Sequence, residues 1–150
     1  MAEDRDALLK HYREMREELL AAIDGLTDAA MTEPSLDGWS VVDHLAHITL
    51  WDDIRAQEVS RISAGHDSAW RMSEEQDEVF NTMGYELRRG MSVAQVRWEL
   101  AGSQERLLAA IASSSPRGLD ATLYGEAGLT SGHQAQHAGW IRQWRERQGI

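Results

Sequence analysis

Cysteine is absent from the 150 residues of the sequence. Its absence excludes disulfide bonds, thiolate metal ligands and a cysteine nucleophile supplied by the protein. Any metal ion would have to be held by His, Asp or Glu. Proline occurs only at Pro34 and Pro116, and helical periodicity stops at both positions. Most of the chain is therefore free to form long helices.

Basic residues are fewer than acidic residues in this sequence. Lysine and arginine number 15 against 25 acidic residues, which gives a formal net charge of −10. A nucleic-acid-binding protein needs a basic face to displace phosphate counterions, so we expect no nucleic-acid partner. The one concentrated basic stretch, Arg142–Arg147, is explained more simply by cations that favour the C-terminal end of a helix.

Long apolar runs are also missing. No stretch approaches the roughly 20 apolar residues that a membrane-spanning helix needs. The first residues, Met1–Arg5, are charged and lack the apolar core of a secretory signal. Hydrophobic residues make up 42% of the sequence and charged residues 27%, as in an ordinary globular protein. We expect a cytoplasmic protein without a membrane partner, in which residues 1–150 form a single domain.

Helical periodicity is the dominant pattern that is present. Apolar residues recur at spacings of three and four, as in the series Leu8, Tyr12, Met15, Leu19 and Ile23. Four segments have this character. We expect helices from Asp4 to about Asp24, from Ser40 to Ala64, from Ser92 to about Ala112, and from near Thr130 to Arg147.

Capping motifs support these boundaries. Ser40-Val-Val-Asp43 and Ser92-Val-Ala-Gln95 each resemble a capping box at the start of a helix. Ser73-Glu-Glu-Gln76 predicts a short extra helix in the middle connection. Loops are expected over residues 27–38 and for about a dozen residues after Pro116, and no alternating β-branched run predicts a strand. The predicted fold class is all-α, a four-helix bundle with a short extra helix.

The most informative motif is His133-Gln-Ala-Gln-His137. Residues four apart on a helix share one face and lie about 6 Å apart, so two imidazoles can converge on one ion. A helical projection places both on the stripe of Trp140, Ile141 and Trp144, facing the bundle interior. Inward imidazoles are costly unless their nitrogens are satisfied. A metal ion would satisfy them, and so would hydrogen bonds to neighbouring groups.

A third ligand should come from another helix. The segment that begins at Ser40 offers His44 and His47. The projection places His47 beside Leu50, while His44 lies towards the other edge of the same face. A core histidine hydrogen-bonded to a carbonyl is the simpler interpretation for each, and the projection favours His47 only slightly.

The two motifs together resemble a known family. Trp39-Ser-Val-Val-Asp-His-Leu-Ala-His47, followed by His133-x-x-x-His137, is similar to the DinB/YfiT-like superfamily of bacterial metal-binding bundles. The wider pattern, which includes Trp51 and His137-Ala-x-Trp140-Ile-x-x-Trp144-Arg145, is most similar to the ClbS/DfsB-like branch. The resemblance covers nearly the whole chain.

The resemblance implies a divalent metal ion held by His47, His133 and His137, with zinc or nickel favoured. It also implies a bundle with a crossover connection and a homodimer. His44 occupies a position that is commonly apolar in the family, which leaves open an accessory role or a shifted register.

Three neutral nitrogen ligands leave coordination positions open for water or substrate. The resemblance includes thiol S-transferases, thiol-dependent isomerases and proteins that protect against reactive natural products. It therefore implies a metal-dependent enzyme that acts on a small reactive electrophile by hydrolysis or thiol S-transfer. Its partners would be a small-molecule substrate and a low-molecular-weight thiol. The alternative is a non-catalytic dimeric bundle that binds metal or ligand.

The catalytic residues stay unknown from the sequence. A general acid or base could be Asp43, Asp52, Tyr85 or Glu86, but surface solvation is the simpler explanation of the carboxylates. Residues 66–91 match no motif, and substrate selectivity is expected to reside there.

Other aromatic residues carry weaker expectations. Trp39 and Trp70 lie in or near loops and could line the mouth of a site. His11 and His66 are expected to be ordinary surface residues.

Overall fold

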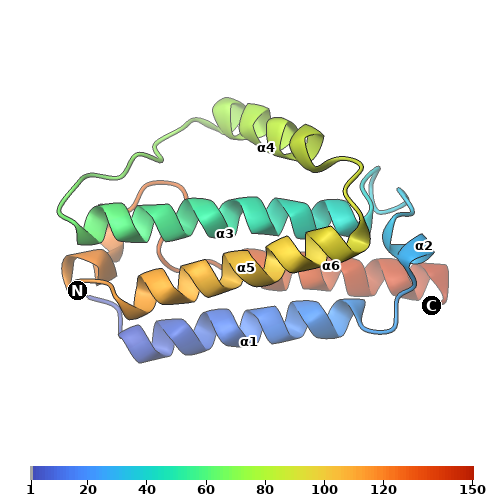
Figure 1. The fold of residues 1–150 in the computed structure, drawn as a ribbon, viewed down its shortest axis with the longest axis horizontal. Coiled ribbons are helices and arrows are strands. Elements are labelled where there is room, and N and C mark those ends of the chain that lie inside the picture. The colour runs from blue at the N-terminus through green and yellow to red at the C-terminus, as the bar shows by residue number, and fades with distance from the viewer. Residues whose placement is uncertain (1) are drawn as a thin grey trace.

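The computed structural model describes residues 2–150, and within them every element of regular structure is helical. Four long helices lie side by side as a bundle, and a further helix lies outside it (Figure 1). The predicted all-α bundle with an extra helix is confirmed. The bundle helices are α1 (Arg5–Ile23), α3 (Val41–Ser63), α5 (Val93–Ala112) and α6 (His133–Gln148), and the outer helix is α4 (Glu74–Arg88).

The predicted caps form at the starts of these helices. Ser40 and Asp43 make a reciprocal capping box at α3, because the Ser40 side chain accepts from the Asp43 backbone and the Asp43 carboxylate accepts from the Ser40 backbone. Ser73 and Gln76 do the same at α4. At α5 only half of the motif forms, since Ser92 caps the backbone without a reciprocal bond from the side chain three residues on.

The connection between α3 and α5 is a crossover. The two helices run parallel, because contacts along them keep nearly constant sequence separations: 51 for Asp52 with Ser103, and 52 for Ser63 with Ser115 just after the end of α5. Parallel neighbours require the chain to return along the bundle, and α4 with its linkers does so above α3 (Figure 1). By contrast α3 and α6 are antiparallel.

The hydrophobic core has two parts. One part packs α3, α5 and α6 around the C-terminal half of α1, with Trp144 buried at 1% exposure. The other packs the N-terminal half of α1 against the opposite end of the bundle, with Tyr12 fully buried. Burying such side chains contributes roughly 1.5–3 kcal/mol each and is the main stabilising term of the bundle.

A polar layer lies between the two parts of the core, with one side chain from each bundle helix. The Arg16 guanidinium forms an ion pair with Asp52 at 2.5 Å and donates to the Gln134 side chain at 2.7 Å. The Ser103 hydroxyl donates to the same Asp52 oxygen. These contacts connect α1, α3, α5 and α6 through buried groups.

The predicted start of the last helix is wrong by about three residues. Helix α6 begins at His133, not near Thr130. The backbone carbonyls before His133 form hydrogen bonds with side chains of α1 and not with the backbone of a helical turn. The Tyr12 hydroxyl donates to the Leu129 carbonyl, and the His11 ring forms a hydrogen bond with the Ser131 carbonyl. These tertiary bonds hold the chain in a non-helical conformation up to Gly132.

Three other segments are more helical than predicted. The loop over residues 27–38 contains the one-turn helix α2 (Asp28–Met31), capped by Thr27. The loop after Pro116 contains two 3₁₀ turns, η1 (Arg117–Leu119) and η2 (Ala121–Leu123). The middle helix α4 has 15 residues and is not short. No helix within residues 2–150 is long and apolar enough to cross a membrane.

Candidate metal centre

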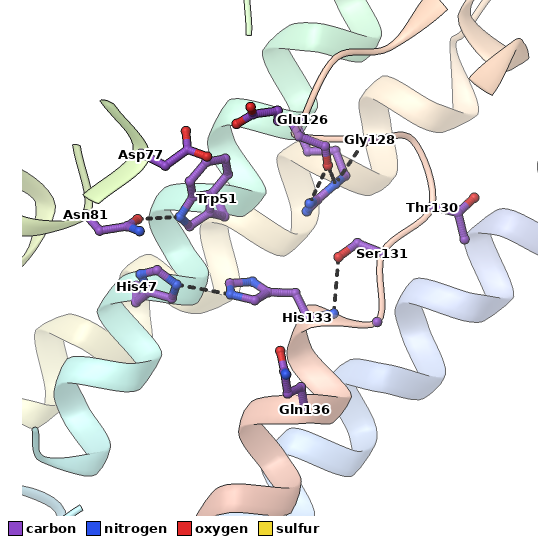
Figure 2. A pocket seen from close by; sticks show the side chains of 13 residues that line it. His47, Trp51, Asp77, Asn81, Glu126, Gly128, Thr130, Ser131, His133 and Gln136 are labelled. Atoms are coloured by element: carbon purple, nitrogen blue, oxygen red, sulfur yellow. Dashed lines mark hydrogen bonds between the residues drawn. The ribbon is translucent and has the colours of Figure 1, made fainter. Parts of the chain in front are cut away.

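The antiparallel packing of α3 against α6 brings three histidines together. The Nε2 atom of His133 lies 3.0 Å from Nε2 of His47 and 3.0 Å from Nε2 of His137. One nitrogen from each ring lies within 4.8 Å of the others. We call these residues the histidine trio. His47 faces His133 across the gap between α3 and α6 (Figure 2).

The geometry of the histidine trio is compatible with one metal ion. Nitrogen ligands lie about 2.0–2.1 Å from zinc, so two ligands of one ion are roughly 3.0–3.4 Å apart. Hydrogen bonds alone satisfy the trio poorly, because a neutral imidazole has one N–H and one acceptor nitrogen. The Nε2 atom of His133 can form only one good hydrogen bond, yet it faces two rings. The residues present therefore fit a divalent cation.

The electrostatics of the trio favour neutral imidazoles. Burial, with a smaller contribution from the charge of His44, lowers the pKa of His47 to about 4. Burial, followed by the neighbouring His47 and Arg55, lowers the pKa of His133 to about 3. Burial and the adjacent rings lower the pKa of His137 to about 2. At neutral pH all three lone pairs are thus available without the loss of a proton.

His44 lies outside the trio but contacts it. Its Nδ1 atom lies 2.7 Å from Nδ1 of His137, on the side of that ring away from the trio. The sequence left open a shifted register, and the structure places His47 in the trio and His44 behind it. Burial lowers the pKa of His44 as well. Its Nε2 atom has no hydrogen-bond partner within the described chain.

Aromatic side chains cover the trio. The Trp39 ring contacts His44 and His47 edge-on, with centroid distances of 5.4 and 5.5 Å. Tyr85 of α4 stacks on Trp39 at 5.7 Å, so the outer helix contributes to the cover. On the other side Trp140 lies 4.8 Å from His137. These rings restrict the access of water to the nitrogen atoms.

A cleft of about 650 Å³ opens beside His47 and His133 (Figure 2). Its walls come from α3, from α4, from the start of α6 and from the loop before α6. The polar and charged residues that line it are His47, Arg55, Asp77, Asn81, Glu126, Thr130, Ser131, His133 and Gln136, together with Trp51. A ligand in this cleft would reach two members of the histidine trio directly.

Trp39 and Trp70 were predicted to line a mouth, but neither lines this cleft. Trp39 covers the trio, and Trp70 packs behind Trp51 at 5.6 Å. Trp51 is the tryptophan that lines the cleft, and its indole N–H donates to the Asn81 side chain at 2.7 Å. Residues 66–91 do contribute to the cleft, through Asp77 and Asn81 of α4.

The four acid–base candidates from the sequence do not line the cleft. Asp43 is a helix cap, and Glu86 forms an exposed ion pair with Arg89. Tyr85 stacks on Trp39. Surface solvation is the wrong explanation for Asp52, which is 1% exposed and belongs to the buried polar layer.

His11 was expected to be an ordinary surface residue, and that expectation is wrong. Its half-buried ring lies 2.7 Å from the Ser131 carbonyl oxygen, which ties α1 to the loop before the trio. His66 is exposed, as expected.

Sequence reasoning missed the charged residues of the cleft. Asp77 and Glu126 face each other across segments far apart in the chain (Figure 2), and no motif joins them. The pKa of Glu126 is raised, chiefly by a hydrogen bond with Asp77. The sequence did contain a pattern that could have identified Arg55 as a residue of the cleft. His47, Trp51 and Arg55 follow one another at intervals of four, so they share one face of a helix.

Comparisons with known proteins agree with this architecture. Residues 11–141 match the family model described as the DinB superfamily. A crystal structure of an uncharacterised protein from Escherichia coli UTI89 is similar, with a TM-score of 0.80. Its sequence identity is 16%, over 97% of this chain and 95% of that chain, so the likeness concerns the fold. No curated protein matches the sequence.

Proposed function

The chain belongs to the DinB superfamily, and from that premise we propose that it is a metal-dependent enzyme acting on a small reactive electrophile. The reaction is hydrolysis of the electrophile, or thiol S-transfer, in which a low-molecular-weight thiol bonds to the electrophile through its sulfur and gives up its proton. His47, His133 and His137 hold the ion, which is zinc or nickel. Both metals accept imidazole nitrogen ligands. We infer the substrate class from the resemblance to the ClbS/DfsB-like branch, whose members act on reactive natural products.

One observation carries this proposal: the histidine trio borders an open cleft. His47 and His133 belong both to the trio and to the wall of a cleft of about 650 Å³. A structural metal site is closed by protein ligands, whereas a catalytic site keeps a position for water or substrate. Three protein nitrogens beside a cleft of this size correspond to the second arrangement.

The residues of the chain have separate roles in this proposal. A divalent ion on three neutral imidazoles supplies Lewis acidity and lowers the pKa of a coordinating water or thiol. Trp39 and Tyr85 exclude bulk water from one side of the trio. Asp77 and Glu126 make the wall of the cleft acidic, and a hydrogen bond with Asp77 raises the pKa of Glu126. The thiol comes from solution, since the chain has no cysteine.

Elemental analysis tests the metal site. Purified protein should contain about one divalent ion per chain, and His47→Ala, His133→Ala and His137→Ala variants should each lose it. His66→Ala is the matched control because that ring is exposed and far from the trio in sequence. Equal metal content in the control and in the three trio variants would contradict the proposal.

Activity tests the reaction class. Metal-loaded protein is assayed with a strained epoxide in water, and with 1-chloro-2,4-dinitrobenzene and 2-mercaptoethanol. Turnover that disappears in His137→Ala supports an enzyme. Stoichiometric metal without turnover on either electrophile would favour a binding protein.

A non-catalytic dimeric bundle is the second candidate, and one observation favours it. Helix α4 exposes an apolar stripe, Val79, Met83 and Leu87, with exposed fractions of 61, 64 and 73%. Apolar residues at intervals of four on a solvent face are typical of a helix that packs against a partner. Sedimentation of wild type beside Met83→Glu would test whether this stripe supports a homodimer.

A further inference from the structure

Arg55 is a buried cation with no carboxylate partner. Arg55 is only 4% exposed to solvent. The Nε and Nη2 groups donate to the backbone carbonyls of Ala127 and Gly128, at 2.8 to 3.1 Å. Within residues 2–150 Arg55 takes part in no ion pair. The hydrogen bonds of this guanidinium therefore go to two neutral carbonyls, and it also lies over the Tyr12 ring at 5.9 Å from the centroid.

The two buried carboxylates one helical turn from Arg55 are already paired with other arginines. Asp52 forms its ion pair with Arg16, and Glu58 forms its ion pair with Arg61. A guanidinium does not lose its proton in a protein, and an unpaired buried charge is expensive. An anion bound at Arg55 would give this guanidinium the ion pair that neither carboxylate forms with it.

Arg55 faces the cleft that contains the trio. It lines the same cleft as His47 and His133. The guanidinium and the proposed metal ion are therefore two neighbouring positive centres on one cavity wall.

The opposite part of the wall also favours an anion. Helix α6 begins at the cleft with Gly132 as its N-cap and no side-chain cap. The His133 backbone N–H donates to the Ser131 hydroxyl oxygen at 3.1 Å. The positive end of the helix dipole favours negative charge there. Thr130 and Ser131 lie beside this helix end and offer hydroxyl donors (Figure 2).

We propose that Arg55 and the N-terminal end of α6 bind the carboxylate of a monoanionic substrate, which sets its reactive part beside the histidine trio. This inference rests on the proposed function and specifies its substrate class. A single negative charge fits better than a phosphate dianion, because Asp77 and Glu126 also line the cleft and repel further negative charge.

The test compares propionate with propionamide, which has the same shape without the charge. Binding to the protein as purified, and again after saturation with zinc, is followed through tryptophan fluorescence and by calorimetry. Propionate should bind at least about tenfold more tightly than propionamide. Arg55→Met should weaken propionate by about tenfold or more, as expected for a hydrogen-bonded charge. Arg106→Gln is the matched control, since it removes a cation outside this cleft.

A second variant guards against misfolding of Arg55→Met. Thr130 is exposed and lines the cleft, so Thr130→Glu leaves the core intact and adds a competing carboxylate. It should weaken propionate by a similar factor, while Thr130→Gln should not. Equal affinity for propionate and propionamide, wild-type affinity in Arg55→Met, or tighter binding of inorganic phosphate would each overturn the inference. Propionate binding without any metal binding would overturn the proposed function alone, and metal binding without propionate binding would overturn this inference alone.

Discussion

The Nδ1 atom of His44 lies 2.7 Å from the Nδ1 atom of His137. Two nitrogen atoms at this distance share one proton, so one ring donates and the other accepts. If His137 coordinates through Nε2, its Nδ1 carries the proton and donates to His44. Such a bond fixes the tautomer and the orientation of a ligand ring. His44 thus becomes a positioning residue for the proposed metal site, which is a specific form of the accessory role that the sequence left open.

Replacement of His44 should weaken the metal site without abolishing it. His44→Leu keeps all three trio nitrogens but removes the acceptor for His137. Loss of such a partner typically lowers metal affinity by about 10- to 100-fold. Competition with a chelator measures the change, with His66→Ala as control. If His44→Leu bound metal as tightly as wild type, the positioning role would be wrong.

The stability of the metal-free protein should fall as the pH falls below about 6.5, the ordinary pKa of histidine. The trio has pKa values of about 4, 3 and 2 in the folded state, with burial as the main cause. The unfolded chain therefore binds more protons than the folded chain below pH 6.5, and the free energy of unfolding rises with pH in that range. The stabilising contribution is fully present above the unfolded pKa and is lost on acidification.

Urea denaturation between pH 7.5 and 5 measures this dependence. Most carboxylates remain ionised over that range, so histidines dominate the slope. A His47→Leu variant should show a smaller slope than wild type, and His66→Ala an unchanged one. A free energy of unfolding that did not change with pH in the wild type would mean that the rings of the histidine trio are exposed to solvent, contrary to this prediction.

The polar layer should show strong coupling between Arg16 and Asp52. Asp52→Asn leaves a buried guanidinium without its ion pair, and loss of one partner of a buried pair costs about 3–5 kcal/mol. Replacing both residues, as Arg16→Met with Asp52→Leu, removes both charges and should cost much less than the sum of the single changes. Chemical denaturation of the two single variants and the double variant measures the coupling. Additive losses would show that the pair contributes nothing specific.

Gly125 should tolerate no side chain. A Cβ atom at this position would overlap the backbone carbonyl oxygen of Trp70, which cannot move away as a flexible side chain would. Gly125→Ala should therefore destabilise the protein by about 1–3 kcal/mol, the usual cost of forced overpacking. The loop that carries Glu126 should also shift away from the cleft, which Trp fluorescence would report.

Gly132→Ala is the control for that change, because a Cβ there would meet nothing within 4 Å. It lines the same cleft and has an ordinary negative φ of −97°. We expect a difference of less than about 1 kcal/mol from wild type. Equal destabilisation by both substitutions would contradict the steric explanation.

The helices were predictable because their signals are local. Apolar spacing and caps such as Ser40 with Asp43 lie within a few residues of one another, and the backbone bonds they favour form within the same turn. The start of α6 was not predictable, since the bonds from Tyr12 and His11 that keep residues 129 and 131 out of the helix come from more than a hundred residues away.

The sequence by itself determined the helical pattern, the absence of thiolate ligands and the shared face of His133 and His137, because each follows from residue type and helical spacing. Only the tertiary structure decided that His47 and not His44 joins them, since that choice depends on how α3 is rotated and aligned against α6. The same packing placed Arg16 beside Asp52 and Arg55 in the wall of the cleft. Charge balance among buried groups is set by distances in space, and such distances are not encoded in the spacing of any one segment.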